Sequence, residues 1–114
     1  MYDNNNIFAK ILRGEIPASK IYENDHALAF HNIAPKVAVH VLVIPKGEFV
    51  DFRDFTTNAD AEQAAGFWSA VWQTAEIMGI KDAYRTGTNS GEYQSIMHFH
   101  VHLLHDDSFM NDGM

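Results

Sequence analysis

Three histidines, His98, His100 and His102, alternate with apolar residues near the end of the 114-residue chain. Side chains along a β-strand point to opposite faces in turn, so an extended segment places these three imidazoles on one face. Imidazoles side by side repel one another once protonated, and their clustering brings no evident gain in stability. We therefore expect the three histidines to carry chemistry rather than to face solvent by chance.

Two chemistries can be weighed against this spacing. The Cα atoms of His98 and His102 are roughly 13 Å apart along a strand, which is too far for easy convergence on one metal ion. A site of two histidines completed by His31 or His40 stays open. A phosphoryl group suits the spacing better, because the middle imidazole can attack phosphorus while a flanking one donates to the leaving group. The chain has no cysteine and no Walker loop that would offer a rival chemistry.

The final strand must present the histidines, and its pattern predicts how. Residues 94–104 form one extended run in which Met97, Phe99, Val101 and Leu103 share the face opposite the histidines. We expect that apolar face to pack against a helix. Upstream, the pattern predicts a short helix over residues 7–12 that ends at Gly14, a hairpin of residues 19–24 and 27–33, and a buried strand over 37–45.

The clearest helix follows, after a loop over residues 46–57 with at most one helical turn. Thr57 and Asp60 fit a capping box, apolar residues then repeat every three or four positions, and Gly79 ends the run. The spacing of Trp68 and Trp72 favours a core or dimer contact over a ligand shelf. With strands over 83–89 and 94–104 and a loop between them, the sequence predicts one α+β domain over residues 1–114, an antiparallel sheet covered by one long helix.

Composition narrows the function classes. The net charge is −7 and the eight basic residues are scattered, so no stripe exists that could meet a nucleic acid. Local hydrogen-bond donors must therefore hold any anionic ligand. No apolar run is long enough for a membrane span, and the first residues lack the pattern of a signal peptide. Together with the absence of cysteine, these features favour a cytoplasmic protein.

The segment His98-Phe99-His100-Val101-His102-Leu103-Leu104 resembles the signature of the histidine-triad (HIT) family, in which three histidines alternate with apolar residues. The stretches IFAKILRGEIPASKIYEND, ALAFHNIAP and HVLVIPK are similar, in the same order, to the branch of histidine-triad nucleotide-binding proteins. The resemblance implies the HIT fold, a five-stranded antiparallel sheet with one long and one short helix, and a homodimer that joins two sheets. It also implies a purine nucleoside phosphoramidase that cleaves nucleoside 5′-monophosphate derivatives through a nucleotidyl-histidine intermediate, with no cofactor or metal required.

The resemblance assigns roles position by position. It implies that His100 is the nucleophile, that His102 contacts the phosphate and leaving group, and that His98 and His40 support them through hydrogen bonds. Further contacts to the phosphate and leaving group fall on Asn89, Gln94 and Ser95, and contacts to the ribose and base on Asn32 and Ile33. From the residues alone, His40 could instead be a hydrogen-bonded core histidine and Ser95 an ordinary strand hydroxyl.

The chain departs from the family pattern at three places. Asn32 stands where an acidic residue is usual, and Tyr93 where a glycine is common. The tail lacks the tryptophan-proline ending and carries Asp106, Asp107 and Asp112 instead. Those aspartates lead to the hypothesis that the protein prefers phosphoramidates, including those of lysine-like amines, over dinucleoside polyphosphates. Two alternatives stay open: a dinucleoside polyphosphate hydrolase, and a nucleotide-binding or interaction protein with slow turnover.

Overall fold

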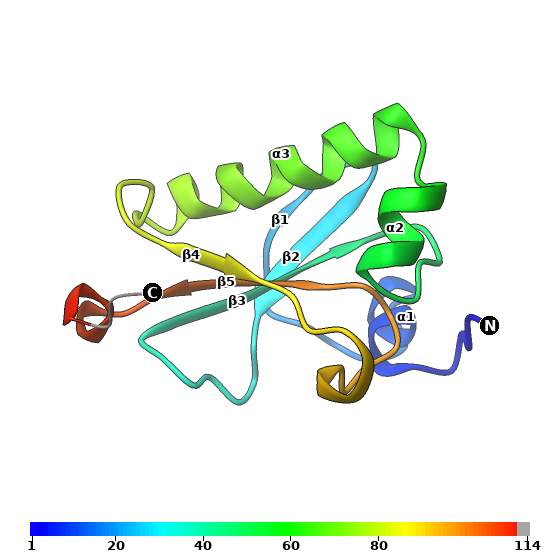
Figure 1. The fold of residues 1–114 in the computed structure, drawn as a ribbon, viewed down its shortest axis with the longest axis horizontal. Coiled ribbons are helices and arrows are strands. Elements are labelled where there is room, and N and C mark those ends of the chain that lie inside the picture. Colours follow the sequence, from blue (N-terminus) through cyan, green and yellow to red (C-terminus); the bar gives the residue numbers. More distant parts are fainter. Residues whose placement is uncertain (112–114) are drawn as a thin grey trace.

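The computed structural model describes residues 1–111 of the chain (Figure 1). The helices and strands, in chain order, are α1 (Ile7–Leu12), β1 (Lys20–Glu23), β2 (Ala27–His31), β3 (Val39–Pro45), α2 (Phe52–Asn58), α3 (Ala61–Ile77), β4 (Arg85–Gly87) and β5 (Val101–His105). Short 3₁₀ helices span Gly91–Tyr93 and Asp107–Asn111. None of the helices described is long and apolar enough to cross a membrane.

The five strands form one sheet in the order β1-β2-β3-β5-β4, and every neighbouring pair is antiparallel. The predicted α+β class and the five-stranded antiparallel sheet are therefore confirmed, as is the hairpin of β1 and β2. The long helix α3 runs across one face of this sheet (Figure 1). The short strand β4 lies at one edge, where its outer backbone groups face no other strand of the sheet.

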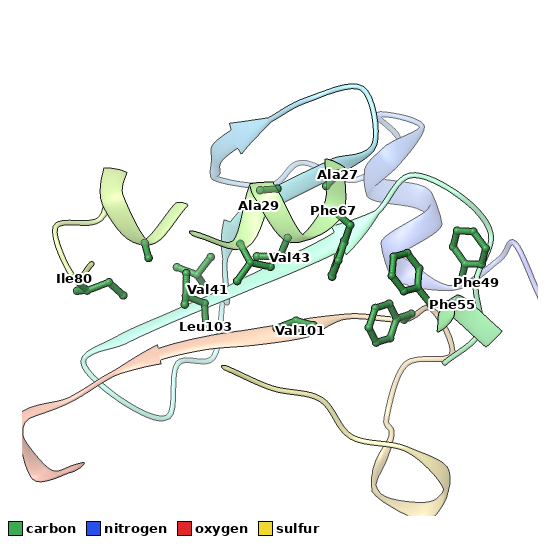
Figure 2. Close-up of a cluster of buried hydrophobic side chains, with 14 residues drawn as sticks. Ala27, Ala29, Val41, Val43, Phe49, Phe55, Phe67, Ile80, Val101 and Leu103 are labelled. Carbon is green, nitrogen blue, oxygen red and sulfur yellow. The ribbon is translucent and has the colours of Figure 1, made fainter. Parts of the chain in front are cut away.

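Alternate side chains of the central strands divide the core between the two faces of the sheet. One cluster joins Ala29, Val41, Val43 and Leu103 to Phe67 of α3, and a group of phenylalanines closes its end (Figure 2). The second cluster lies on the other face and joins strand residues, such as Leu42, to α1. Full burial of a large apolar side chain stabilises the fold by about 1.5–3 kcal/mol, so these two layers hold the sheet between α1 and α3.

The ends of the helices agree with the predictions except at one cap. Gly14 and Gly79 follow α1 and α3 with φ of +79° and +74°, the left-handed conformation that ends a helix. The predicted capping box of Thr57 and Asp60 is wrong. The N-cap of α3 is Asp60 itself, which exchanges hydrogen bonds with Gln63. Thr57 belongs to α2, a seven-residue helix where we expected at most one turn.

The last strand is shorter than predicted, since only Val101–His105 join the sheet. Residues 94–100 approach it irregularly, and the Phe99 amide donates to the Phe49 carbonyl at 2.7 Å instead. Phe99 and Val101 still enter the core with Leu103, whereas Met97 is 44% exposed, so its predicted core position is wrong. Trp68 and Trp72 are 42% and 52% exposed on α3, so they are not core residues, and the other half of that expectation, a dimer contact, stays a prediction.

Candidate active site

The face of β5 that does not meet α3 carries the histidines. His102 lies opposite Leu42 of β3 in the sheet, and Leu42 belongs to the cluster on the α1 side. His40, two residues earlier on β3, faces the same way, and its ring centroid is 5.1 Å from that of His102. His40 and His102 therefore lie on the same face of the sheet.

Two adjoining hollows open beside these rings. An apolar hollow of about 260 Å³ lies between α1, β2 and β3 and is bordered by His100. A larger, more polar hollow of about 540 Å³ is bordered by His40 and Asn89. Asn32, Ser95 and His102 border both hollows and form the boundary between them. The arrangement can receive a ligand with an apolar part on one side and a polar part on the other, with His102 at the junction.

The protonation of His100 follows from its main-chain partner. Its Nδ1 lies 2.8 Å from the carbonyl oxygen of His98, and a carbonyl can only accept, so Nδ1 carries the proton. The neutral ring therefore has its lone pair on Nε2. Burial lowers the pKa of His100, against the opposite effect of the His98 carbonyl, so the ring is uncharged at neutral pH. An uncharged imidazole with a free Nε2 lone pair is a competent nucleophile.

His98 lies behind His100 and is fully buried. Its Nε2–H donates to the Pro45 carbonyl at 2.8 Å, and its Nδ1 accepts from the hydroxyl of Tyr2 at 2.6 Å. Burial is the main cause that lowers the pKa of His98 to about 4. Both ring nitrogens are thus satisfied in the neutral state, which fixes the orientation of the residue whose carbonyl holds His100.

A chain of hydrogen bonds sets the protonation of His102. The Lys36 amide donates to His40 Nδ1 at 3.0 Å, so the proton of neutral His40 is on Nε2. That Nε2–H donates to His102 Nδ1 at 2.9 Å, which leaves the proton of His102 on its own Nε2. Burial first, and then the neighbouring His100 and His40, lower the pKa of His102 to about 4. With its ring centroid 5.2 Å from that of His100, His102 offers an N–H beside the lone pair of His100.

The Asn32 amide lies beside this relay, and because His40 Nε2 carries the proton directed to His102, the Asn32 Nδ2 and His40 Nε2 atoms do not hydrogen-bond to each other. The Asn32 Oδ1 accepts from the Ala34 amide at 2.9 Å, which turns Nδ2 toward His40 Nε2 at 3.2 Å. Because the His40 proton is directed to His102, the Asn32 Nδ2 protons are left for an acceptor in the hollows. The side chain at this position therefore acts as a donor, whereas the acidic residue usual in the family can only accept when ionised.

The HIT domain model of protein families matches residues 13–109, which include His40, His98, His100 and His102. The chain belongs to the HIT family. An uncharacterized 13.2 kDa HIT-like protein of Azospirillum brasilense is 48% identical over 106 residues, which are 90% of this chain and 87% of the relative. A HIT-like protein of Rickettsia prowazekii is 43% identical over 107 residues, which cover 91% and 89% of the two chains.

Solved structures agree with the family and the fold. A structure described as a Hit Like Protein superposes with a TM-score of 0.80 at 43% identity, covering 90% of this chain and 99% of that one. A HIT family hydrolase from Legionella pneumophila gives a TM-score of 0.79 at 33% identity, with 87% and 90% covered. A histidine triad nucleotide-binding protein from Candida albicans gives 0.77 at 26% identity, with 86% and 72% covered. The hydrolase among these neighbours supports a hydrolase-type protein.

The structure brings most of the implied HIT ligand residues together. Ser95 borders both hollows, Asn89 borders the polar one, and Ile33 stands 95% exposed at the rim of the apolar one. Gln94 is the exception, since its amide donates to the carbonyls of Val50 and Ile96 at 2.7 and 2.9 Å and it borders neither hollow. Its contact with a phosphate stays a prediction that would require the side chain to turn.

The other histidines lie apart from His100 and His102 or at the rim of the hollows. His31 is exposed and borders the apolar hollow, and His26 packs on Gly66 of α3. His105 lies beyond the site, with Nδ1 2.6 Å from the Ala83 carbonyl. Within residues 1–111, no group of three or more His, Asp or Glu side chains is arranged to hold a metal ion.

Within the described part of the acidic tail, Asp106 and Asp107 border neither of the two histidine hollows. Asp106 accepts from the amides of Ala38 and Ser108, which lowers its pKa, and it borders a separate hollow with Phe109. Asp107 borders that same separate hollow, and Asp112 lies outside the described residues. An influence of Asp106 or Asp107 on substrate choice would therefore have to act at long range.

Sequence reasoning missed two residues of the N-terminal segment. Tyr2 bonds to His98, and Phe8 meets the ring of His100 edge-on, with ring centroids 5.0 Å apart. No local pattern marks either contact, because each partner lies more than 90 residues away in the sequence. Phe8 could only be assigned to the apolar face of its helix.

Proposed function

We propose that this HIT protein hydrolyses purine nucleoside 5′-monophosphate derivatives, with phosphoramidates as its preferred class. The observation that carries the proposal is the neutral pair at the junction of the hollows: His100 with its Nε2 lone pair and His102 with its Nε2–H. In-line attack on phosphorus needs such a lone pair, and a hydrogen-bond donor beside the leaving nitrogen stabilises that nitrogen as the P–N bond breaks.

The chemistry takes two steps. His100 Nε2 attacks phosphorus and the P–N bond breaks, the leaving nitrogen takes the proton of His102 Nε2–H, and the amine departs while the nucleotide is held on His100. Water then attacks the same phosphorus and breaks the bond to His100, which regains its lone pair. One water is consumed overall: its hydroxyl ends on phosphorus, and its other proton returns to His102 Nε2 in place of the proton given to the amine.

The two hollows suggest how the substrate lies. The apolar hollow, walled by residues such as Phe8, Phe30 and Leu42, suits a purine base, and Ile33 at its rim would cover one side of the ring. Asn32 would donate to a ribose oxygen at the junction. The polar hollow would take the phosphate and the leaving group beside Ser95 and Asn89. These local donors would hold the anion against a chain with a net charge of −7.

His100→Ala tests the proposal. We expect turnover of an adenosine phosphoramidate to fall by at least about a thousandfold while AMP still binds, because the nucleophile is lost but the apolar hollow is not. His105→Ala is the matched control and should keep the wild-type rate. Trapping of a nucleotidyl adduct on His100 of the wild type would identify the attacking atom.

The competing functions give different outcomes. AMP binding without turnover of any nucleoside phosphoramidate by the wild type would favour the binding-protein alternative. A larger kcat/KM for a dinucleoside polyphosphate than for a phosphoramidate would favour the polyphosphate alternative and contradict the proposed preference.

The proposal includes a reaction that needs no metal, because two neutral imidazoles supply both the attacking atom and the donor. Full activity after exhaustive treatment with a chelator is the expected result. If zinc binds one-to-one and turnover requires it, this mechanism is contradicted. That result would favour the metal site of two histidines completed by His31 or His40.

We also propose that the protein is a homodimer. Support comes from the resemblance and from the surface around Trp68, which borders a small hollow with Thr86 and Gly87 of the edge strand β4. Trp72 lies one helical turn further along α3 and is also exposed. An edge strand beside exposed tryptophans is a surface that a second copy could cover by continuing the sheet.

A further inference from the structure

Tyr2 touches the candidate site from outside the matched HIT domain, which begins at residue 13. Its hydroxyl lies 2.6 Å from His98 Nδ1, and the two rings meet edge-on with centroids 5.6 Å apart. Burial raises the pKa of the Tyr2 phenol, so the group stays protonated and able to donate. The contact joins the start of the chain to a fully buried imidazole 96 residues away.

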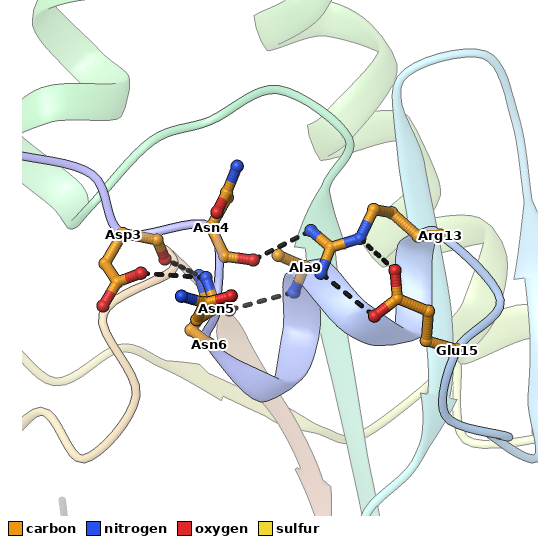
Figure 3. Close-up of polar contacts among 7 residues, drawn as sticks. All are labelled: Asp3, Asn4, Asn5, Asn6, Ala9, Arg13 and Glu15. Carbon is orange, nitrogen blue, oxygen red and sulfur yellow. Dashed lines mark hydrogen bonds and ion pairs between the residues drawn. The ribbon is translucent and has the colours of Figure 1, made fainter.

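The segment that carries Tyr2 is folded and held in place. Asp3 begins a turn in which its side chain and its carbonyl accept from Asn5 and Asn6 (Figure 3). Asn6 then caps α1 by accepting from the Ala9 amide at 2.9 Å. Arg13 closes the far side by donating to the Asn4 carbonyl at 2.8 Å (Figure 3). Tyr2 therefore directly precedes an ordered turn that leads into α1.

His98 depends on Tyr2 for its second hydrogen bond. The imidazole ring has two polar atoms. Its Nε2–H donates to the Pro45 carbonyl, and its Nδ1 accepts from the Tyr2 hydroxyl. An unpaired polar atom in a fully buried ring is costly, and it would favour a rotated ring or the other tautomer. The same residue supplies the carbonyl that holds His100 Nδ1–H at 2.8 Å.

We propose that Tyr2 is a positioning residue of the active site: its hydroxyl fixes His98, and His98 in turn fixes the orientation of His100. This inference rests on the proposed function, in which His100 is the nucleophile. Tyr2 borders neither of the two histidine hollows, so it acts without touching the substrate.

Tyr2→Phe is the direct test, because it keeps the ring and removes only the hydroxyl. We expect kcat to fall about five- to tenfold, the factor that corresponds to one net hydrogen bond, while KM stays within about twofold. Tyr84→Phe is the matched control: it removes a hydroxyl from a part-exposed tyrosine that borders neither histidine hollow, and it should keep the wild-type kcat. An unchanged kcat in Tyr2→Phe, or an effect on KM alone, overturns the inference.

The ¹⁵N NMR signals of His98 and His100 separate positioning from packing. In the wild type we expect a neutral His98 ring with the proton on Nε2 and a hydrogen-bonded Nδ1. In Tyr2→Phe the His98 Nδ1 signal should move toward that of an unbonded imine nitrogen, because its donor is gone, and the His100 signals should move as well, because His98 no longer holds that ring in place. A merely structural contact would change the His98 signal and the midpoint of unfolding but leave the His100 signals in place, and unmoved His100 signals overturn the inference.

The same measurements distinguish this inference from the proposed function. If the wild type shows no turnover, the proposed function fails, and the inference fails with it as a statement about catalysis, although the NMR signal still reports whether the contact exists. If Tyr2→Phe does not fold, Arg13→Ala replaces it, since it loosens the turn (Figure 3) without removing any side chain that contacts His98. We expect Arg13→Ala to lower kcat in the same direction, and an unchanged kcat would overturn the inference.

Discussion

Acidification should destabilise this protein through His98, a titratable ring that the fold buries completely. Burial lowers the pKa of His98 to about 4, whereas the unfolded chain restores the ordinary value of 6.5. Between these two values the unfolded state binds a proton that the native state does not bind. The stability that His98 confers by staying neutral is therefore complete above about pH 6.5 and is lost as the pH falls toward 4.

The size of the effect follows from the two pKa values. At pH 5 the difference in protonation lowers the free energy of unfolding by about 2 kcal/mol relative to pH 7.5. Small domains are stable by only about 5–15 kcal/mol in total, so the loss is large enough to measure. Urea unfolding followed by circular dichroism at the two pH values gives the free energy of unfolding at each.

His98→Asn isolates this contribution, because asparagine does not titrate. The variant is expected to be less stable at both pH values, and apart from His100, whose charge acts on His98, the other histidines cancel in the comparison. The drop in free energy of unfolding from pH 7.5 to pH 5 should then be about 2 kcal/mol smaller in the variant than in the wild type. Equal drops in the two proteins would refute the view that His98 is held neutral by burial.

Two further predictions concern packing and assembly. Gly66→Ala should destabilise the protein by about 1–3 kcal/mol despite the better helix propensity of alanine, because a Cβ there would lie 2.6 Å from Cδ2 of His26. In a His26→Ala background Gly66→Ala should lose most of its destabilising effect. If the free energy of unfolding still falls there, contact with His26 is not the cause. Trp72→Glu should convert the proposed dimer to monomers in analytical ultracentrifugation, while Trp72→Phe should not, and a dimeric Trp72→Glu protein would contradict the proposed interface.

The apolar periodicity was enough to predict the sheet and its main helix, but the helix caps were harder to place. Two candidate N-caps, Thr57 and Asp60, lie three residues apart, and the pattern favoured the wrong pairing because it did not show the short helix before them. That helix buries only Phe55, too little apolar surface to produce a visible period. Its cap, Asp51, is a single residue without the reciprocal partner that marks a capping box.

From Phe99 onward the faces of the final segment were predicted correctly, even though its strand bounds were not. Alternation of side chains depends on an extended backbone, and Phe99 keeps its predicted face without pairing in the sheet. At Met97 the chain bends and the rule fails. Within the site, residue types could indicate His40 and His102, but their protonation depends on a main-chain amide at Lys36, for which the sequence carries no signal.

The main-chain bond that orients His100 also bears on how this protein can change over time. The acceptor is the backbone carbonyl two residues earlier, which remains present whatever side chain occupies that position. Substitutions at Asn32, Ile33 or Ser95 can alter the shape of the hollows while that carbonyl still leaves the lone pair on Nε2. During evolution, substitutions at the rim of the hollows could thus have changed which leaving groups and nucleobases the protein accepts, while the His100 ring kept the tautomer that leaves its Nε2 lone pair free.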